Sequence, residues 1–473
     1  NLEDAATAHL GVEVTRRGLY RALSRLDRKG RGILTAVHEG VAGTANGPEL
    51  RERMENRVRP AHARALASLE ALVEELEPIA PPGEGAVRLG PSGIGEPADR
   101  DEVREDLARA LAALRELERE VGELRSRLEL VEQLADRLAG RILDLRAIER
   151  RLAAAAQGLR LVLAPGDDAA AYVRWLDSRG QGRQANLVLA AAPIELGVVL
   201  RESLFAQVEA AVLTSATLST RKRFDFLRSR LGLDSEAVAH SDPPLEVKER
   251  TIVSPFDFAT QTLLGVPTDL PAAEGPEAAF HEATAGVVRG FAEVSGGGIF
   301  ALFTSHSALR RVAELLRRGG AEANWPLFVQ GEGDRSRLLA RFVDAGHGIL
   351  LGTTSFWEGV DVPGDPLRGL VIQKLPFRVP TEPITAARME ALEARGGDAF
   401  QQFMLPHAAL RLKQGFGRLI RSRTDRGAVL VLDDRLVTKR YGRYLRDSLP
   451  DTPLVKGPWI EVRRRLEAFY AAE

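Results

Sequence analysis

The sequence predicts an α/β protein that is built on parallel β-sheets and carries a long α-helical region inserted near its start. After about residue 298, short and continuously apolar runs alternate with helical patterns, which is typical of parallel strands covered by helices on both faces. From about Asp101 to Gln157, apolar residues recur in steps of three and four, which indicates a long helix with one buried face.

Composition narrows the class of protein before any motif is considered. The 473 residues suffice for two or three domains, and 65 basic against 66 acidic side chains leave a net charge of −1. A nucleic-acid path would therefore have to be a local basic groove, because phosphate neutralisation needs clustered Lys and Arg. The absence of cysteine excludes disulfides, thiol catalysis and thiolate-bound zinc or iron–sulfur centres within this chain, and it favours a cytosolic protein.

The start of the sequence has an unusual form. Its first residues, Asn1-Leu2-Glu3-Asp4, show neither an initiator Met nor a signal-peptide pattern, so we expect them to lie inside a longer protein. Nowhere in the sequence does an apolar run reach the roughly 18 residues that a membrane-spanning helix needs.

The inserted helical region is predicted to form an antiparallel hairpin. A helical pattern over residues 49–77 is followed by a Pro/Gly-rich stretch over 78–97, and an uninterrupted helix is then expected over about 101–157. The longer helix carries a heptad-like apolar seam. A parallel coiled-coil dimer is the alternative, but the flanking helix offers this seam a partner within the chain.

The predicted strands fall into two α/β units that join near residues 234–250. In the first unit, parallel strands are expected near residues 161, 187 and 212, with exposed edges. In the second, the expected strands are 299–303, 349–351, 370–373 and 428–432.

Two predicted strands end in small hydroxyl residues. Ser215 and Thr217 belong to a Ser-Ala-Thr string, and Thr304 and Ser305 follow the strand over 299–303. Ligands commonly bind at the carboxyl ends of strands in α/β sheets, where such hydroxyls could hold a phosphate. The alternative, that they only cap the next helix, is equally compatible with these residues alone.

Two further strings are more specific. The loop over residues 352–364 joins backbone amides at glycines to hydroxyls, carboxylates and an aromatic that could stack on a base, whereas its Phe356 is expected in the core. The string over 414–422 places Arg418 and Arg421 three apart, on one face of a predicted helix, with Gln414 a turn earlier. Two guanidiniums so placed suit a triphosphate, although solvated arginines on a surface helix are the alternative.

The order and the residues of these motifs resemble those of the DinG/XPD-like branch of the superfamily 2 ATP-dependent DNA helicases. Residues 356–364 are similar to the fifth motif of that family and residues 414–421 to its sixth, and Lys374–Phe377 and Leu432–Leu436 are worded as in bacterial members. The resemblance covers most of 160–473 and the first few residues. Residues 36–157 match only in position and helicity, where the family inserts its arch.

The resemblance implies RecA-like parallel-sheet helicase lobes, the first of them incomplete, with an inserted helical arch or hairpin. Residues 1–35 would be a remnant of the first RecA-like domain after its DEAH box, 36–157 the arch-like insertion, 158–235 the rest of that domain with the Ser-Ala-Thr motif, and 236–473 the second RecA-like domain.

The resemblance also implies roles for single residues. Arg421 would be the arginine finger, with Arg418 and Gln414 beside the phosphates. The remaining residues would couple nucleotide to DNA (Glu358, Gly359, Asp361, Ser215 and Thr217) or line the path of single-stranded DNA (Thr304, Ser305, Thr353 and Trp357).

Two motifs of the family are missing from this chain. It contains neither a Gly-x-x-x-x-Gly-Lys-Ser/Thr string nor Asp-Glu-Ala-His. The residues that bind ATP and Mg²⁺ would therefore lie mostly upstream, as would any iron–sulfur cluster, and we expect residues 1–473 alone to be inactive as an ATPase.

The resemblance further implies a monomeric, cytoplasmic, nucleoid-associated bacterial protein that acts 5′ to 3′ on single-stranded, forked or tailed DNA. Two other functions stay open: a non-catalytic nucleic-acid-binding or coiled-coil adaptor derived from a helicase, and an RNA helicase. The start without Met argues against the adaptor, and the Phe-Trp-Glu-Gly loop argues against the RNA helicase.

Overall fold

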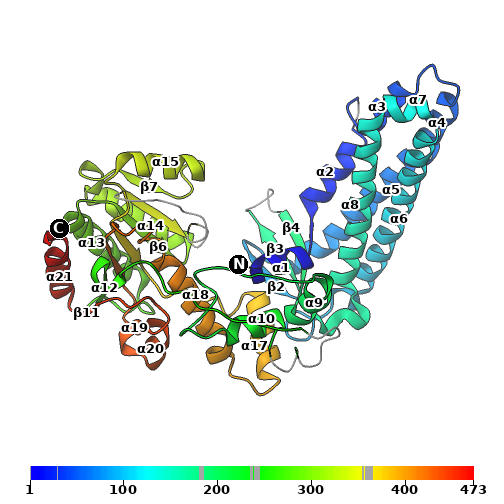
Figure 1. The fold of residues 1–473 in the computed structure, drawn as a ribbon. Coiled ribbons are helices and arrows are strands. Elements are labelled where there is room, and N and C mark those ends of the chain that lie inside the picture. Colours follow the sequence, from blue (N-terminus) through cyan, green and yellow to red (C-terminus); the bar gives the residue numbers. More distant parts are fainter. Residues whose placement is uncertain are drawn as a thin grey trace. The chain divides into compact units, whose positions relative to one another are not determined.

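The computed structural model describes residues 2–28, 30–180, 186–234, 238, 245–353, 356 and 366–472, with the side chains of 2 and 3 left out. The chain forms two compact units (Figure 1). The first comprises Asn1–Leu200 and Pro380–Ala391, and the second comprises Arg201–Val379 and Leu392–Glu473. The four-domain division predicted from the sequence stays a prediction.

The sheet of the first unit is antiparallel, contrary to the expectation of parallel strands there. Its four strands lie in the order β1-β4-β3-β2, and their bounds are β1 Val12–Thr15, β2 Gly85–Arg88, β3 Tyr172–Arg179 and β4 Asn186–Pro193. Only the strand predicted near residue 187 is confirmed, as β4.

The strands predicted near residues 161 and 212 are wrong. Residues 159–163 are the last turns of helix α8 (Ala139–Leu163), which Gly158 allows to lie against β1. A Cβ at Gly158 would approach Val14 Cγ2 to 2.5 Å. Around Val212 the chain is neither helix nor strand and is exposed, and no strand among the described residues pairs with it.

Three long helices form the predicted antiparallel arrangement, with α6 (Asp101–Glu129) packed between α5 (Arg59–Leu76) and α8 (Figure 1). The seam is buried within the chain, which confirms the hairpin. The uninterrupted helix is wrong, because α6 ends at Glu129 and the short α7 (Glu132–Arg137) precedes α8. Leu138 turns inward there and occupies the space beside Gly40, where a Cβ would lie 2.4 Å from Leu138 Cδ2.

One π-helical turn lies between α4 and α5 and another leads into α18, and each ends two residues before a proline. They are η1 (Met54–Val58), before Pro60, and η8 (Phe400–Met404), before Pro406. A proline inside a helix lacks the amide hydrogen, and its ring collides with the carbonyl four residues earlier. The wider π turn accommodates that ring without breaking the helix.

The remaining elements of the first unit surround its sheet and long helices. One of them, α17, comes from far along the sequence: its buried Arg388 donates hydrogen bonds to the carbonyl of Ile194 and the hydroxyl of Thr7. The bounds are α1 Leu2–Leu10, α2 Arg16–Leu26, α3 Ile33–Gly40, α4 Gly47–Arg53, η2 Glu77–Ile79, η3 Pro97–Asp99, η4 Gly166–Ala170, α9 Leu196–Ser203 and α17 Pro383–Glu393.

The second unit is built on a seven-stranded, wholly parallel sheet in the order β11-β5-β10-β9-β6-β8-β7. All four strands predicted in this part are confirmed, and so is the α/β fold class. The bounds are β5 Thr262–Pro267, β6 Ile299–Phe303, β7 Leu327–Val329, β8 Ile349–Thr353, β9 Gly369–Ile372, β10 Gly427–Val431 and β11 Leu454–Gly457.

Helices cover both faces of this sheet, so its central strands are apolar on both sides. Along β6, Ile299 and Phe303 join the core beneath α13, whereas Phe300 joins the core beneath α18. No described helix is both long and apolar enough to cross a membrane. The helices of this unit are η6 Phe205–Gln207, α10 Asp225–Leu231, α12 Phe258–Gln261, α13 Glu277–Ser295, α14 His306–Arg318, η7 Ala321–Ala323, α15 Arg335–Ala345, α18 Leu405–Phe416, α19 Arg435–Thr438, α20 Arg440–Arg446 and α21 Trp459–Ala471.

Candidate functional site

The carboxyl edge of the parallel sheet gathers the hydroxyl residues predicted to contact a nucleic-acid strand. Thr304 and Ser305 follow β6 directly and are exposed, and Thr353 ends the neighbouring β8. Ser305 caps α14, because its Oγ accepts a hydrogen bond of 3.2 Å from the amide of Ala308. The cap uses Ser305 as an acceptor, so its own hydroxyl hydrogen can still be donated.

Thr353 is tied into the sheet edge. Its amide and its hydroxyl both donate to Gln330 Oε1, over 2.6 Å and 3.0 Å, and the side chain is buried. Gln330 follows β7, and its contribution was not foreseen from the sequence. Phe356 lies in the core against Phe300, as predicted.

The loop that follows Thr353 carries four of the predicted site residues. Trp357, Glu358, Gly359 and Asp361 lie outside the described residues.

A buried carboxylate fixes the central part of the same edge. Asp433, just after β10, is fully buried and accepts a hydrogen bond of 3.0 Å from the amide of Leu375, just after β9. Its second partner is Arg435, whose Nη2 lies 2.7 Å from Asp433 Oδ2. The hydrogen bonds with Asp433 raise the pKa of Arg435, which therefore stays charged.

The two predicted arginines follow the end of α18 and do not lie on a helix. Gln414 is in the last turn of α18, the helix ends at Phe416, and Arg418 and Arg421 lie in the turn beyond, all three half-buried. The prediction of a shared helical face is therefore wrong, although the three residues do lie on one short stretch.

Asp425 makes the contacts that hold this arginine turn, which comprises residues 417–425. Its Oδ2 accepts hydrogen bonds from the amides of Arg421 and Ser422, over 2.7 Å and 2.9 Å, and Oδ1 accepts one from Ser422 Oγ. Partial burial acts to raise the pKa of Asp425, but these hydrogen bonds and the nearby Arg421 outweigh it and lower the pKa.

The arginine turn lies at the amino edge of the sheet, opposite the hydroxyl residues. Gln261, immediately before β5, donates from Nε2 to the carbonyls of Ser422 and Asp425, over 3.0 Å and 2.7 Å. Because all seven strands are parallel, the structure separates the predicted residues into a guanidinium set at one edge and a hydroxyl set at the other.

The Ser-Ala-Thr segment lies in the second unit and reaches the helix that carries Gln414. Ser215 and Thr217 hydrogen-bond to each other, with 3.2 Å between their hydroxyls. Two residues later, the carbonyl of Ser219 accepts a hydrogen bond of 3.3 Å from Lys413 Nζ on α18. Thr220 is held by Tyr444 of α20, and burial lowers the pKa of Lys413.

This arrangement offers charge stabilisation and phosphate contacts. Within the described ranges, no three His, Asp or Glu side chains gather as a metal site requires. The guanidiniums of the arginine turn fit the phosphates of a nucleotide, because each presents several donors in a planar array.

The parallel sheet of the second unit thus carries exposed hydroxyls after β6 at one edge and the Gln/Arg turn at the other. The matching family model is described as "Helicase C-terminal domain" and covers residues 288–452. The chain is similar to DinG/XPD-like helicases of superfamily 2.

Similar curated proteins bear helicase and exonuclease names. The chain is 36% identical over 364 residues to "ATP-dependent DNA helicase YoaA" of Escherichia coli, covering 76% of this chain and 52% of that protein. It is 37% identical over 281 residues to "ATP-dependent helicase DinG" of Mycobacterium tuberculosis, covering 59% of this chain and 40% of the relative. For "3'-5' exonuclease DinG" of Bacillus subtilis, the identity is 35% over 304 residues, covering 63% and 31%. The chain thus spans about half, or less, of the length of these relatives.

Among solved structures, one titled "XPD_Helicase" superimposes with a TM-score of 0.53 at 12% identity, covering 96% of this chain and 66% of that one. This similarity supports the fold.

Proposed function

We propose that this chain is the arginine-bearing part of an ATP-dependent DNA helicase that couples ATP hydrolysis to movement along single-stranded DNA. The observation that carries the proposal is the arginine turn, where Arg418 and Arg421 are half-buried and hydrogen bonds from the amides of Arg421 and Ser422 to Asp425 fix the backbone. Solvated arginines on a surface helix would need neither the Asp425 anchor nor the contacts from Gln261.

In the nucleotide half of the proposed cycle, Arg421 would act as the arginine finger. Negative charge builds up on the transferred phosphoryl group, and a positioned guanidinium stabilises it without a proton transfer. Arg418 and Gln414 would hold the phosphates beside it, while Ser215 and Thr217 would pass the state of the nucleotide to α18 through Ser219 and Lys413. The phosphate cradle and the magnesium ligands would come from another segment of the longer protein.

For the contacts to single-stranded DNA, Thr304 and Ser305 at the carboxyl edge of the parallel sheet would donate hydrogen bonds to the phosphates of the DNA. Thr353 would fix the start of the loop that carries Trp357, which would stack on a base. Glu358, Gly359 and Asp361 of this loop would couple strand contact to the nucleotide.

We further propose movement in the 5′ to 3′ direction, action on forked or tailed duplexes, a monomeric state and a location on the bacterial nucleoid in the cytoplasm. The expected inactivity of residues 1–473 alone belongs to the same proposal. An adaptor built on a coiled-coil dimer receives less support, because the helical seam is already buried within this chain.

The test is DNA-stimulated ATPase activity of the longer protein. Because an arginine finger supplies about 10³-fold or more in kcat, Arg421→Ala should lower kcat by at least about that factor. Arg423→Ala is the matched control, since Arg423 is exposed in the same turn, and it should stay within about twofold of the wild type.

Equal activity of the two variants would refute the role of Arg421. Stimulation by RNA rather than DNA would contradict the substrate class, and ATP turnover by purified residues 1–473 above the contaminant level would refute the inactivity of the chain alone.

A further inference from the structure

The stretch of the sequence with the highest density of basic residues, 16–32, lies in the first unit. Residues 16–32 contain seven basic residues (Arg16, Arg17, Arg21, Arg25, Arg28, Lys29 and Arg31) and one acidic residue, Asp27, so the stretch carries 7 − 1 = +6 in a chain of net charge −1. Helix α2 and the turn after it form this stretch (Figure 1). Lys29 lies outside the described residues.

The contacts of α2 assign a role to each of its faces. Ala22, Leu23 and Leu26 are buried against the rest of the unit. On one side of α2, Arg16 pairs with Glu77 of η2 at 2.8 Å. On the other side, Arg25 pairs with Asp144 of α8, at 2.5 Å.

A third face points away from all of these partners. Arg17, Arg21 and Ser24 are spaced by four and three residues, so they share one side of α2, and all three are exposed. Arg28 and Arg31 extend the same exposed cationic stretch into the turn after the helix. Asp27, the one acidic residue of the stretch, pairs with Arg59 at 3.4 Å.

The ion pairing of this surface is incomplete in the described structure. Among the described residues, no salt bridge or side-chain hydrogen bond is formed by Arg21, Arg28 or Arg31. We refer to Arg21, Arg28 and Arg31 together as the α2 basic surface.

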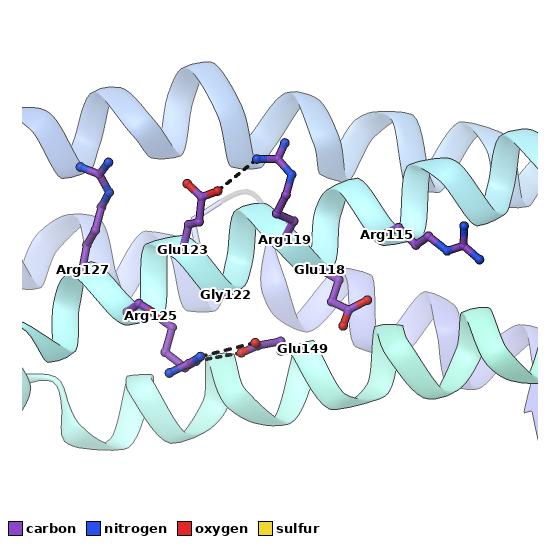
Figure 2. A pocket seen from close by; sticks show the side chains of 9 residues that line it. Arg115, Glu118, Arg119, Gly122, Glu123, Arg125, Arg127 and Glu149 are labelled. Carbon is purple, nitrogen blue, oxygen red and sulfur yellow. Dashed lines mark hydrogen bonds and ion pairs between the residues drawn. The ribbon is translucent and has the colours of Figure 1, made fainter.

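On another arginine-rich surface of the same unit, the arginines are paired with carboxylates of the protein. Around Gly122 on α6, arginines alternate with glutamates, and Arg125 lies 2.8 Å from Glu149 while Arg119 lies 3.1 Å from Glu123 (Figure 2). Those cations are neutralised within the protein. Carboxylates thus pair with the arginines around Gly122, whereas among the described residues none pairs with the α2 basic surface.

We propose that the α2 basic surface binds the phosphate backbone of a nucleic-acid single strand, as a second contact point besides the hydroxyls of the parallel sheet. Exposed guanidiniums that form no ion pair among the described residues match a polyanion, because arginines donate readily to phosphate oxygens. Rising about 1.5 Å per residue, the helix spaces Arg17 and Arg21 roughly 6 Å apart along its axis. This inference rests on the proposed function for the choice of a single strand.

Binding of a fluorescently labelled thirty-residue oligothymidine to residues 1–473, followed by anisotropy over a range of salt concentrations, tests this inference. The variant R21Q/R28Q/R31Q should bind at least about tenfold more weakly, and the slope of log Kd against log salt should fall by roughly 2, because each phosphate contact contributes about 0.7 on a single strand. The variant R21K/R28K/R31K should keep the affinity within about twofold, which separates charge from misfolding.

The matched control is R57Q/R115Q/R150Q. It removes three exposed arginines from other surfaces of the same unit, and it should bind like the wild type. Equal binding by R21Q/R28Q/R31Q and the wild type would overturn the inference and leave the proposed function standing. Failure of the wild-type chain to bind the strand would overturn both. Binding of polyglutamate with the same dependence on Arg21, Arg28 and Arg31 would assign the surface to an acidic protein partner instead.

Discussion

At the scale of single residues, two aspartates place the groups that would act on ligands. Asp425 gathers two backbone amides and one hydroxyl at the arginine turn, and Asp433 joins the ends of β9 and β10 through Leu375 and Arg435. Neither aspartate would touch a nucleotide or a strand in the proposed function. Both are positioning residues, because their loss would release the segments that carry Arg421 and the carboxyl edge.

The lowered pKa of Asp425 predicts a dependence of stability on pH. A carboxylate whose pKa is depressed on folding stabilises the folded state above its unfolded pKa of about 3.9, and this contribution is lost as pH falls through the folded pKa. Asp425→Ala should therefore lower the free energy of unfolding by about 1–3 kcal/mol at pH 7, and by clearly less at pH 3. Urea unfolding at the two pH values measures both differences.

The exposed Asp451, substituted by Asn, is the control for this measurement and should change little at either pH. A deficit of the Asp425→Ala variant that is equally large at pH 3 and pH 7 would contradict the assignment.

At the scale of elements, close approach decides whether an apolar run becomes a helix or a strand. Residues 159–163 have the composition of a strand, yet they continue α8, because Gly158 lets the helix lie directly on β1. Short apolar runs fit both structures equally well, and only the surface they pack against separates the two. The break between α6 and α8 has the same kind of origin, since burial of Leu134 and Leu138 outweighs continuation of the heptad.

Substitution of Gly158 tests this packing. A Cβ there would lie 2.5 Å from Val14 Cγ2 and 2.6 Å from Val12 Cγ1, so Gly158→Ala should destabilise the first unit by about 1–3 kcal/mol. Gly140→Ala in the same helix is the control, because nothing lies within 4 Å of that position, and the better helix former should be neutral or stabilising by up to about 1 kcal/mol. Thermal unfolding of both variants gives the comparison, and stabilisation by both would refute the close contact.

At the scale of the whole molecule, the first unit is completed by a segment from near the end of the chain. Helix α17 packs there through buried Arg388, whose Nη2 donates to Thr7 Oγ1 over 3.0 Å, and through Glu390, which pairs with Arg88. Residues more than 190 positions apart thus share one core, which no local pattern announces.

Truncation of Arg388 should release α17. Arg388→Ala leaves the carbonyl of Ile194 and the hydroxyl of Thr7 without this donor in a buried setting, so hydrogen exchange of the α17 amides should accelerate at least tenfold, as a loss of about 1.4 kcal/mol or more implies. Glu390→Gln serves as the control and should accelerate exchange by less than about fivefold, because its ion pair is partly exposed. Unchanged protection of α17 in Arg388→Ala would show that apolar packing alone holds the helix.

The amino-acid sequence by itself determined the parallel strands of the second unit, the apolar seam of the helical region and the strings that carry Gln414, Arg418 and Arg421. These features are local, since strand and helix periods and turn residues are written in neighbouring positions. The tertiary structure alone decided that residues 159–163 are helical, that the long helix breaks after Glu129, and that the arginines and the hydroxyls lie at opposite edges of the sheet. Contacts between distant residues set these outcomes, and such contacts leave no periodic trace in the sequence.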